Sequence, residues 1–283
     1  MSRNYLADIC LQSERAAAFG NFNSISSIGF IIGPTAAGWL MMTNNGFQKV
    51  AVLSTTIFLL NALLVFFFIP PSAPENKENK EDNTQLSSLT TLTKVPWHRM
   101  WDLFLISFLL SLSMIAFRAN FTSVLTHRFD TDDLTNGYVL SFNGIIGTLS
   151  GALVQFISPY FSSNSQMHNT FAIGMVASLL AITIAPSFTL VVLLLIPLCL
   201  SSSVLRVTNA SGIYSRADPN TRGLIVGAGN TLTSLARTLG PTFAGVAQEI
   251  SIYGPGWTGV IIAALGTLVG FIAPEMKIKQ HQS

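Results

Sequence analysis

The sequence contains few cysteines, histidines and charged residues, and each shortage excludes a class of function. Cys10 and Cys199 are the only cysteines in 283 residues, and both lie in or beside apolar stretches, so neither a disulfide framework nor a thiolate metal site is expected. Charged residues make up only 10% of the chain, and the net charge of +2 is too balanced to suggest a nucleic-acid partner. The sequence therefore argues against redox chemistry and nucleic-acid binding.

The histidines and glycines lack the spacing that enzymatic sites need. His98, His127, His168 and His281 are expected in loops or at helix ends, and they are not at metal-ligand spacing. No glycine-rich nucleotide-binding loop is present. We therefore expect no enzyme activity, no catalytic residue, no metal site and no cofactor.

Long apolar segments, by contrast, dominate the chain. Hydrophobic residues make up 49% of it and the mean hydropathy is +0.52, which is typical of a surface that faces lipid. A helix needs about 20 apolar residues to cross a hydrocarbon core of ~30 Å. Eight segments are long enough, at about 16–41, 49–69, 101–125, 137–157, 169–186, 188–208, 223–248 and 257–274. The predicted fold class is an all-α, polytopic membrane protein with eight transmembrane helices.

One connection between these segments is long and polar. Pro70, Pro71 and Pro74 stop a helix, and residues 75–82 (ENKENKED) are rich in charge. Residues 71–98 therefore predict a solvated linker, with a regulatory or partner-binding role as the alternative. The linker separates two spans from six.

Lysine and arginine predict the orientation of the spans. The linker side holds Arg3, Arg15, Lys77, Lys80, Lys94, Arg99, Arg216, Arg222, Lys277 and Lys279, and the other side holds Lys49 and Arg128. Cytosolic loops carry the excess of basic residues in membrane proteins. Both termini and the linker are therefore expected in the cytosol.

The first and seventh spans repeat each other at a fixed offset of 207 residues. The identical pairs are Arg15 and Arg222, Gly20 and Gly227, Asn23 and Asn230, Ser27 and Ser234, Gly33 and Gly240, Pro34 and Pro241, Thr35 and Thr242, Ala37 and Ala244, and Gly38 and Gly245. The two spans lie six spans apart, so the repeat unit is six helices. Residues 1–70 are then the last two helices of an N-terminal bundle, 99–283 are a C-terminal six-helix bundle, and four helices are expected before Met1.

Residues 29–38 (GFIIGPTAAG) resemble the motif gxxxGPxxGG of the fifth helix in drug:proton antiporters of the major facilitator superfamily, with Ala37 in place of a glycine. Ala7-Asp8 and Glu14-Arg15 resemble the loop between helices 4 and 5 of its tetracycline-transporter-like group. The resemblance implies helices 5 to 12 of a transporter with two six-helix bundles. Residues 159–168 (PYFSSNSQMH) lack the basic residues of the family's loop motif, which puts cytosolic latching by that loop in doubt.

Arg237 is the first candidate for the substrate path. A charge at the bilayer centre costs at least ~2.5 to 3.5 kcal/mol, so an arginine inside a span needs a reason. Arg237 shares a helix face or its edges with Asn230, Thr233 and Ser234, because residues three, four and seven apart lie on one side of a helix. Arg237 would bind an anionic substrate group or pair with a carboxylate on another helix. The alternative is a structural arginine bonded to carbonyls near Pro241.

The other candidates are neutral polar residues, helix-bending residues and one more arginine. Asn23 and Asn230 face a central cavity or form hydrogen bonds between helices. Prolines and glycines at the repeat motif bend helices and permit close packing, and the resemblance implies a role in gating. These candidates are Gly33, Pro34, Gly38, Gly240, Pro241 and Gly245. Arg118 either lines the path or extends to the outer interface, and Arg206 is expected to extend to the cytosolic interface.

The predicted function is secondary active transport of a small molecule through the bilayer by alternating access. Two other hypotheses remain open, namely a non-transporting isoform or fragment, and a membrane receptor or scaffold. Asp102 and Glu249 are expected at the edges of their helices, so no carboxylate is predicted at mid-membrane. Proton coupling needs such a group. Either coupling uses a helix outside this chain, or the protein is not a proton antiporter.

Overall fold

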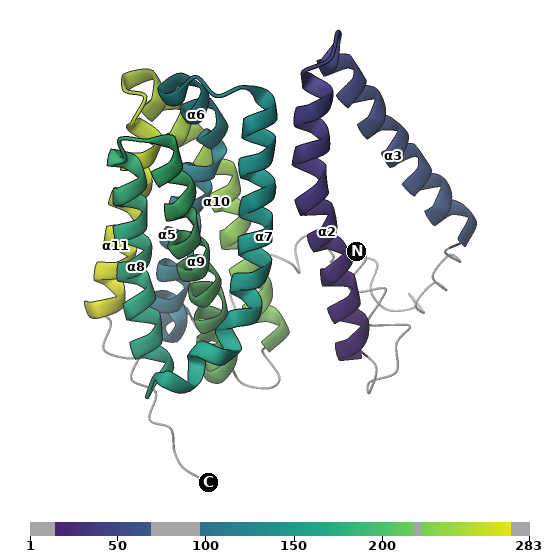
Figure 1. Cartoon of the computed structure of the whole chain (residues 1–283). Coiled ribbons are helices and arrows are strands. Elements are labelled where there is room, and N and C mark those ends of the chain that lie inside the picture. The colour runs from purple at the N-terminus through teal and green to yellow at the C-terminus, as the bar shows by residue number, and fades with distance from the viewer. Residues whose placement is uncertain (1–14, 69–96, 218–221, 273–283) are drawn as a thin grey trace, which may run out of the picture.

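The computed structural model describes residues 15–68, 97–217 and 222–272, and within these ranges the chain is helical with no strand. The helices are α2 Arg15–Met41, α3 Gly46–Phe68, α5 Trp97–Ala119, α6 Phe121–Phe129, α7 Asp133–Ile157, α8 Asn164–Ile184, α9 Phe188–Arg216, α10 Arg222–Ile250 and α11 Gly254–Ile272, with a 3₁₀ turn at Ser158–Tyr160. Helices α5 to α11 form one bundle, and α2 and α3 stand beside it (Figure 1). Of the expected linker, residues 71–96 lie outside the described ranges, and α5 begins at Trp97.

Polar side chains mark where several helices begin. Asp132 Oδ1 accepts a hydrogen bond from the Thr135 amide at 3.0 Å and thereby caps α7. Ser163 and Ser187 cap α8 and α9 in the same way. Hydrogen bonds from Thr135 hold the pKa of Asp132 below its usual value. The capped starts explain why the predicted apolar segments became separate helices.

The prediction of an all-α, multi-pass membrane protein is confirmed. Six described helices are long and apolar enough to cross a membrane. The predicted spans 16–41 and 223–248 are also long helices, namely α2 and α10, but their polar and small residues lower their hydropathy. Their crossing of the membrane, and with it the count of eight, stays a prediction.

The third predicted span, 101–125, was wrong as a single helix. The helix ends at Ala119, and α6 begins at Phe121 after Asn120 leaves the helical region with φ −115° and ψ 15°. The Asn120 side-chain amide donates to Gln248 Oε1 of α10 at 2.5 Å. This bond joins residues 128 positions apart, so no local pattern in the sequence indicates the break.

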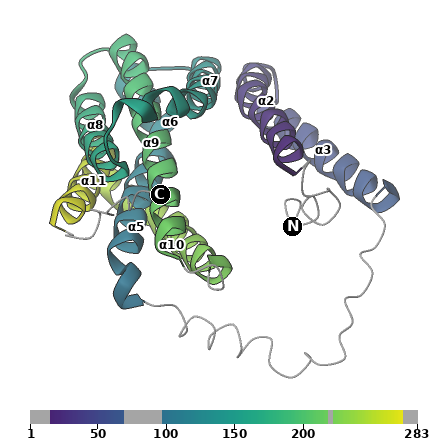
Figure 2. The ribbon, with the colours of Figure 1, turned by 90° about the horizontal axis from the view of Figure 1, so that it is seen from below.

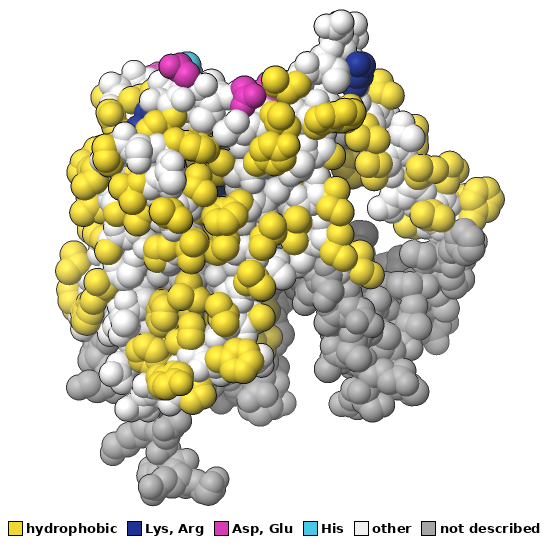
Figure 3. Space-filling model, viewed as in Figure 1, with side chains coloured by type: hydrophobic (Ala, Val, Ile, Leu, Met, Phe, Trp, Pro, Cys, Tyr) yellow, Lys and Arg dark blue, Asp and Glu magenta, His cyan; other side chains and the backbone are white. Residues whose placement is uncertain are grey.

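Apolar side chains fill the interior of the bundle and also cover its outside. The core includes Met100, Ile106, Leu179, Leu195 and Val260. Outside, large apolar side chains of α3 are exposed, for example Phe58 at 75% and Phe66 at 79%. Figure 3 shows hydrophobic side chains over this face of the molecule, with acidic side chains only at its upper edge. Such a surface suits lipid or further helices rather than water.

Helix α2 touches α7 through backbone atoms. A Cβ on Gly137 would lie 2.6 Å from the Pro34 carbonyl oxygen, and a Cβ on Gly144 would lie 3.0 Å from the Phe30 carbonyl oxygen. A Cβ on Gly38 would come as close to the backbone of α7. Only glycine permits this approach, so small residues fix the distance between the two helices.

A pair of hydroxyl groups completes this contact. Thr35 Oγ1 donates to Ser141 Oγ at 2.7 Å, and the Thr35 amide donates to the same oxygen at 3.1 Å. Ser141 is buried. Since lipid cannot replace these partners, the bonds add directional stability to the glycine contact.

We expect Gly137→Ala to destabilise the protein, because the new methyl group would clash with the Pro34 carbonyl and push α2 from α7. Overpacking of this kind costs about 1–3 kcal/mol. Thermal unfolding of the detergent-solubilised protein measures the effect. Gly147→Ala on the same helix is the control, because nothing lies within 4 Å of its Cβ position. Equal melting temperatures for the two variants would contradict the tight contact.

Candidate functional site

Helix α10 carries a stripe of polar and small side chains along one face. Asn230, Ser234, Arg237, Thr238 and Pro241 are all exposed. The opposite face holds the buried residues Ile225, Ala228, Ala236 and Ala244, and the helix packs mainly against α5 and α11. Figure 2 shows α7, α9 and α10 on the side of the bundle that is turned towards α2 and α3. The polar stripe of α10 therefore lies outside the core of the bundle.

Arg237 is exposed within this stripe. It makes no hydrogen bond or ion pair with any other residue in the described part of the chain. In particular, no bond to the carbonyls near Pro241 is formed there. The structure places Asn230 two helical turns from Arg237 on the same stripe. The side chain of Asn23 lies outside the described residues.

Arg118 belongs to a second polar group, which joins three helices of the bundle. The Arg118 guanidinium, on α5, interacts with the thiol of Cys199 on α9. It is repelled by Arg206, which also lies on α9. The Cys199 thiol donates to Asn143 Oδ1 of α7 at 2.7 Å. Arg206 is exposed and lies ten residues before the end of α9. Its Cα is therefore far from the helix end, where the expected extension to the interface would bring its side chain. Sequence reasoning missed Asn143, Cys199 and Arg206 as members of one group.

The helix-bending and small-residue candidates fall into different environments. Pro34 and Gly38 lie at the α2–α7 contact described above. Gly240 packs against Ile115 of α5, where a Cβ would meet the side chain at 2.6 Å. Gly33 and Gly245 have open space at their Cβ positions. Gly38 of the repeat motif therefore packs tightly against α7, whereas its counterpart Gly245 has no described atom within 4 Å of its Cβ position.

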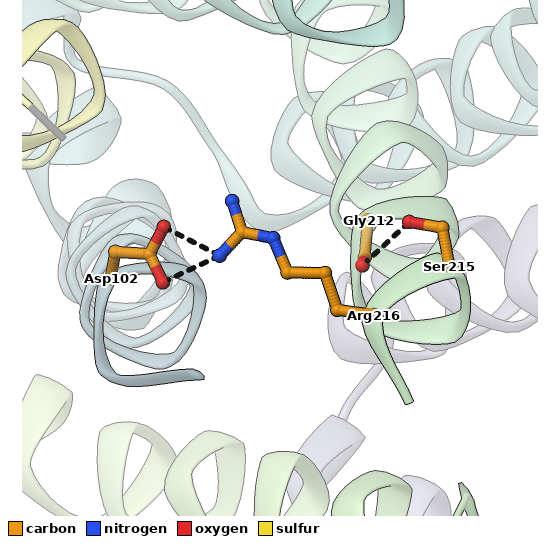
Figure 4. Close-up of polar contacts among 4 residues, drawn as sticks. All are labelled: Asp102, Gly212, Ser215 and Arg216. Atoms are coloured by element: carbon orange, nitrogen blue, oxygen red, sulfur yellow. Dashed lines mark hydrogen bonds and ion pairs between the residues drawn. The ribbon is translucent and has the colours of Figure 1, made fainter. Parts of the chain in front are cut away.

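A buried ion pair was not foreseen from the sequence. Nη1 of Arg216, at the end of α9, donates to both carboxylate oxygens of Asp102 on α5, at 2.8 and 2.7 Å (Figure 4). The two side chains are only 8% and 5% exposed. Ser215 beside it donates to the Gly212 carbonyl at 3.0 Å. The pair ties α5 to α9 at the end of the bundle where α5 begins.

His168 was expected in a loop or at a helix end, and the structure places it four residues after the start of α8. It lies in α8 and is buried, with Nδ1 2.9 Å from Thr208 Oγ1 of α9. Asn164 Nδ2 also donates to the Thr208 carbonyl at 2.9 Å. The segment without the expected basic residues therefore joins α8 to α9 through neutral hydrogen bonds. Asn164 and His168 bond to Thr208, which is 40 or more positions away. The residues next to His168 in the sequence therefore do not indicate that it is buried.

The arrangement of long helices and polar faces matches a known family. The sequence profile of the Major Facilitator Superfamily matches residues 1–241. The chain belongs to this superfamily. This finding confirms the resemblance to the superfamily that residues 29–38 indicated.

The similar proteins have low sequence identity to this chain, but the similarity covers most of it. Solute carrier family 22 member 18 of Mus musculus is 26% identical over 250 residues, which are 85% of this chain and 60% of that protein. Multidrug resistance protein 2 of Bacillus subtilis (strain 168) is 24% identical over 89% of this chain and 62% of its own. Quinolone resistance protein NorA of Staphylococcus aureus (strain MRSA252) is 20% identical over 98% of this chain and 70% of its own. The chain spans about three-fifths of the length of the first two relatives.

Solved structures show the same fold. A bacterial homologue of the iron transporter ferroportin, inward-facing, superposes with a TM-score of 0.68 at 11% identity, over 95% of this chain and 65% of that one. A bacterial homologue of the human lysosomal transporter Spinster, inward-facing and occupied, gives 0.70 at 14% identity, over 100% of this chain and 74% of that one. The major facilitator fold is therefore confirmed.

We expect Asp102→Asn to destabilise the bundle strongly, because Arg216 would keep its charge in a buried place after losing its bonds to the Asp102 carboxylate. Losing one partner of a buried pair costs about 3–5 kcal/mol. Thermal unfolding and abundance in the membrane measure the loss. The double variant Asp102→Leu/Arg216→Met removes both charges and should recover most of the stability. Glu249→Gln, an exposed carboxylate at the end of α10, is the control. A double variant no more stable than Asp102→Asn would contradict this account of the pair.

Proposed function

We propose that the protein is a secondary active transporter that moves small molecules across the bilayer by alternating access. Membership of the major facilitator superfamily supports this function. So do relatives named for solute transport and for resistance to drugs and quinolones. Since the chain spans about three-fifths of the first relatives, the activity is proposed for the full-length protein.

The polar stripe of α10 carries this proposal. Asn230, Ser234 and Arg237 are exposed in a molecule whose other outer surfaces are largely apolar. In the hydrocarbon core such groups need water or polar partners, so they line a cavity or an interface rather than face lipid. We assign them to the wall of a substrate path between the two bundles.

The contact between α2 and α7 supports a two-bundle arrangement. In this proposal residues 1–70 belong to the N-terminal bundle, 71–98 form a cytosolic linker and 99–283 form the C-terminal bundle. Glycines at 38, 137 and 144 let the backbones of α2 and α7 approach closely along this line. Such a contact suits two bundles that tilt against each other, with Pro34 and Gly38 at the seam. Gly33, Gly240, Pro241 and Gly245 would shape the same movement.

The basic residues on the linker side support cytosolic termini in this scheme. A membrane receptor or scaffold is the alternative. In a scaffold, the polar stripe of α10 would pack permanently against another helix. The two functions differ in whether water reaches the stripe.

A cysteine placed in the stripe tests the proposed path. In a full-length protein without its native cysteines, Ser234→Cys should react with a water-soluble thiol reagent, because the residue is exposed on the polar face. Leu239→Cys should react at least about tenfold more slowly, because thiolates form poorly in lipid. Leu239 is also exposed but lies on the apolar side of α10. Equal reactivity, or no reaction at Ser234→Cys, would favour the scaffold.

Arg237 can be tested by its charge and its shape. We expect Arg237→Ala to abolish transport and Arg237→Lys to reduce it, because lysine keeps the charge but loses the planar fork of guanidinium donors. Efflux of a fluorescent quinolone by the full-length protein, per molecule in the membrane, measures both. Lys49→Ala, at an exposed cation near the start of α3, is the control. Normal efflux per molecule in Arg237→Ala would remove Arg237 from the path.

A further inference from the structure

Arg118, Arg206 and Asn143 form a group that has hydrogen-bond donors but few acceptors. Arg118 lies on α5, Arg206 on α9 and Asn143 on α7. The Cys199 thiol donates to Asn143 Oδ1 at 2.7 Å, and Arg206 follows Cys199 by two helical turns on the same helix, α9. The charges of Arg118 and Arg206 both act on Cys199 and oppose each other. The group therefore concentrates two positive charges on one part of the bundle.

Few of these donors are satisfied within the described residues. Arg206 has one side-chain bond, to Ser203 Oγ, and at 3.4 Å it is long. The Asn143 carbonyl oxygen accepts from Cys199, while the Asn143 amide hydrogens have no partner in the described ranges. Guanidinium groups cannot accept hydrogen bonds. What the group lacks is a ligand with several acceptor oxygens.

The carboxylates that the structure describes do not supply those oxygens. The acidic residues of the described ranges are Asp102, Asp130, Asp132, Asp133 and Glu249. Asp102 is paired with Arg216, and the others lie in the loop before α7, at its start or at the last turn of α10. Arg118 and Arg206 lie in two neighbouring spans, and no carboxylate of the described residues is paired with either of them. Uncompensated charges are costly in lipid, so an anion at this place would be held firmly.

We propose that this group, the donor group of Arg118, Arg206 and Asn143, binds the anionic part of the substrate, an organic carboxylate or a similar oxyanion. The inference rests on the proposed transport function and adds the charge class of its substrate. Arg118 and Arg206 donate to the oxyanion, and the Asn143 amide supplies a third donor. Cys199 positions Asn143 by holding its carbonyl oxygen, which turns the amide hydrogens away from the thiol.

Two pairs of probes of similar size and opposite charge test the charge class. Benzoate and fluorescein are anions, and benzylammonium and rhodamine 123 are cations. Binding to the purified full-length protein is measured by the rise in its melting temperature and, for the dyes, by fluorescence anisotropy. We expect at least one anion to bind and its cationic counterpart to bind at least tenfold more weakly. Binding of the cations only, or of no probe, overturns the proposal.

Variants test the residues. Arg206→Gln should fold normally, because Arg206 makes only one long bond, and should weaken anion binding by about tenfold or more, as expected for a hydrogen bond to a charged group. Asn143→Asp should raise the melting temperature without ligand, because it gives the arginines a counter-charge, and should abolish anion binding. Lys49→Gln is the control for loss of an exposed cation.

The outcomes separate the inference from the transport function. Unchanged anion binding in both Arg206→Gln and Asn143→Asp overturns the proposed site. If the cysteine at position 234 reacts as expected but only cations bind, the transport proposal stands and the anion proposal fails. If that cysteine is unreactive, the transport proposal itself fails.

Discussion

The hydrocarbon core offers no hydrogen-bond partner, and the structure depends on this constraint throughout. Each backbone group must be satisfied within the protein, and helices achieve this without help from neighbours. Hydroxyl side chains follow the same rule, since Thr55 and Thr56 on α3 donate to carbonyls four residues earlier. On α3, whose apolar side chains are exposed on all sides, these two hydroxyl groups are satisfied within the helix.

The same constraint explains how the helices meet. Burying apolar surface provides little attraction between helices in lipid, so close packing and a few polar bonds must hold them. Gly259 of α11 approaches Ser113 of α5, whose hydroxyl donates to the Gly259 carbonyl at 2.6 Å. The α2–α7 contact uses the same combination, with glycines for approach and Thr35 bonded to Ser141 for direction. Small residues therefore set the helix positions on which every polar site depends.

The arginines show how differently one residue type is treated. Arg216 is buried against a carboxylate. Arg128, at the end of α6, donates to the last carbonyls of α8 and contacts the rings of Phe129 and Tyr253. Arg118 and Arg206 repel each other, and no carboxylate of the described residues pairs with them. The contacts of Arg216 and Arg128 stabilise the bundle. The guanidinium groups of Arg118 and Arg206 instead keep hydrogen-bond donors that could bind a ligand.

The sequence alone predicts the class of fold, because length and hydropathy decide which segments can cross a bilayer. It also predicts the family, because residues 29–38 and their repeat at 236–245 are contiguous motifs that can be recognised without knowledge of their packing partners. It did not indicate the end of α5 at Ala119, the burial of His168 or the pairing of Asp102 with Arg216, since each depends on a partner far along the chain. Nor did it bring Asn143 and Cys199 to Arg118. These features depend on the folded arrangement, because a side chain's partner is set by which helices pack together. That packing in turn depends on glycine contacts between segments distant in sequence.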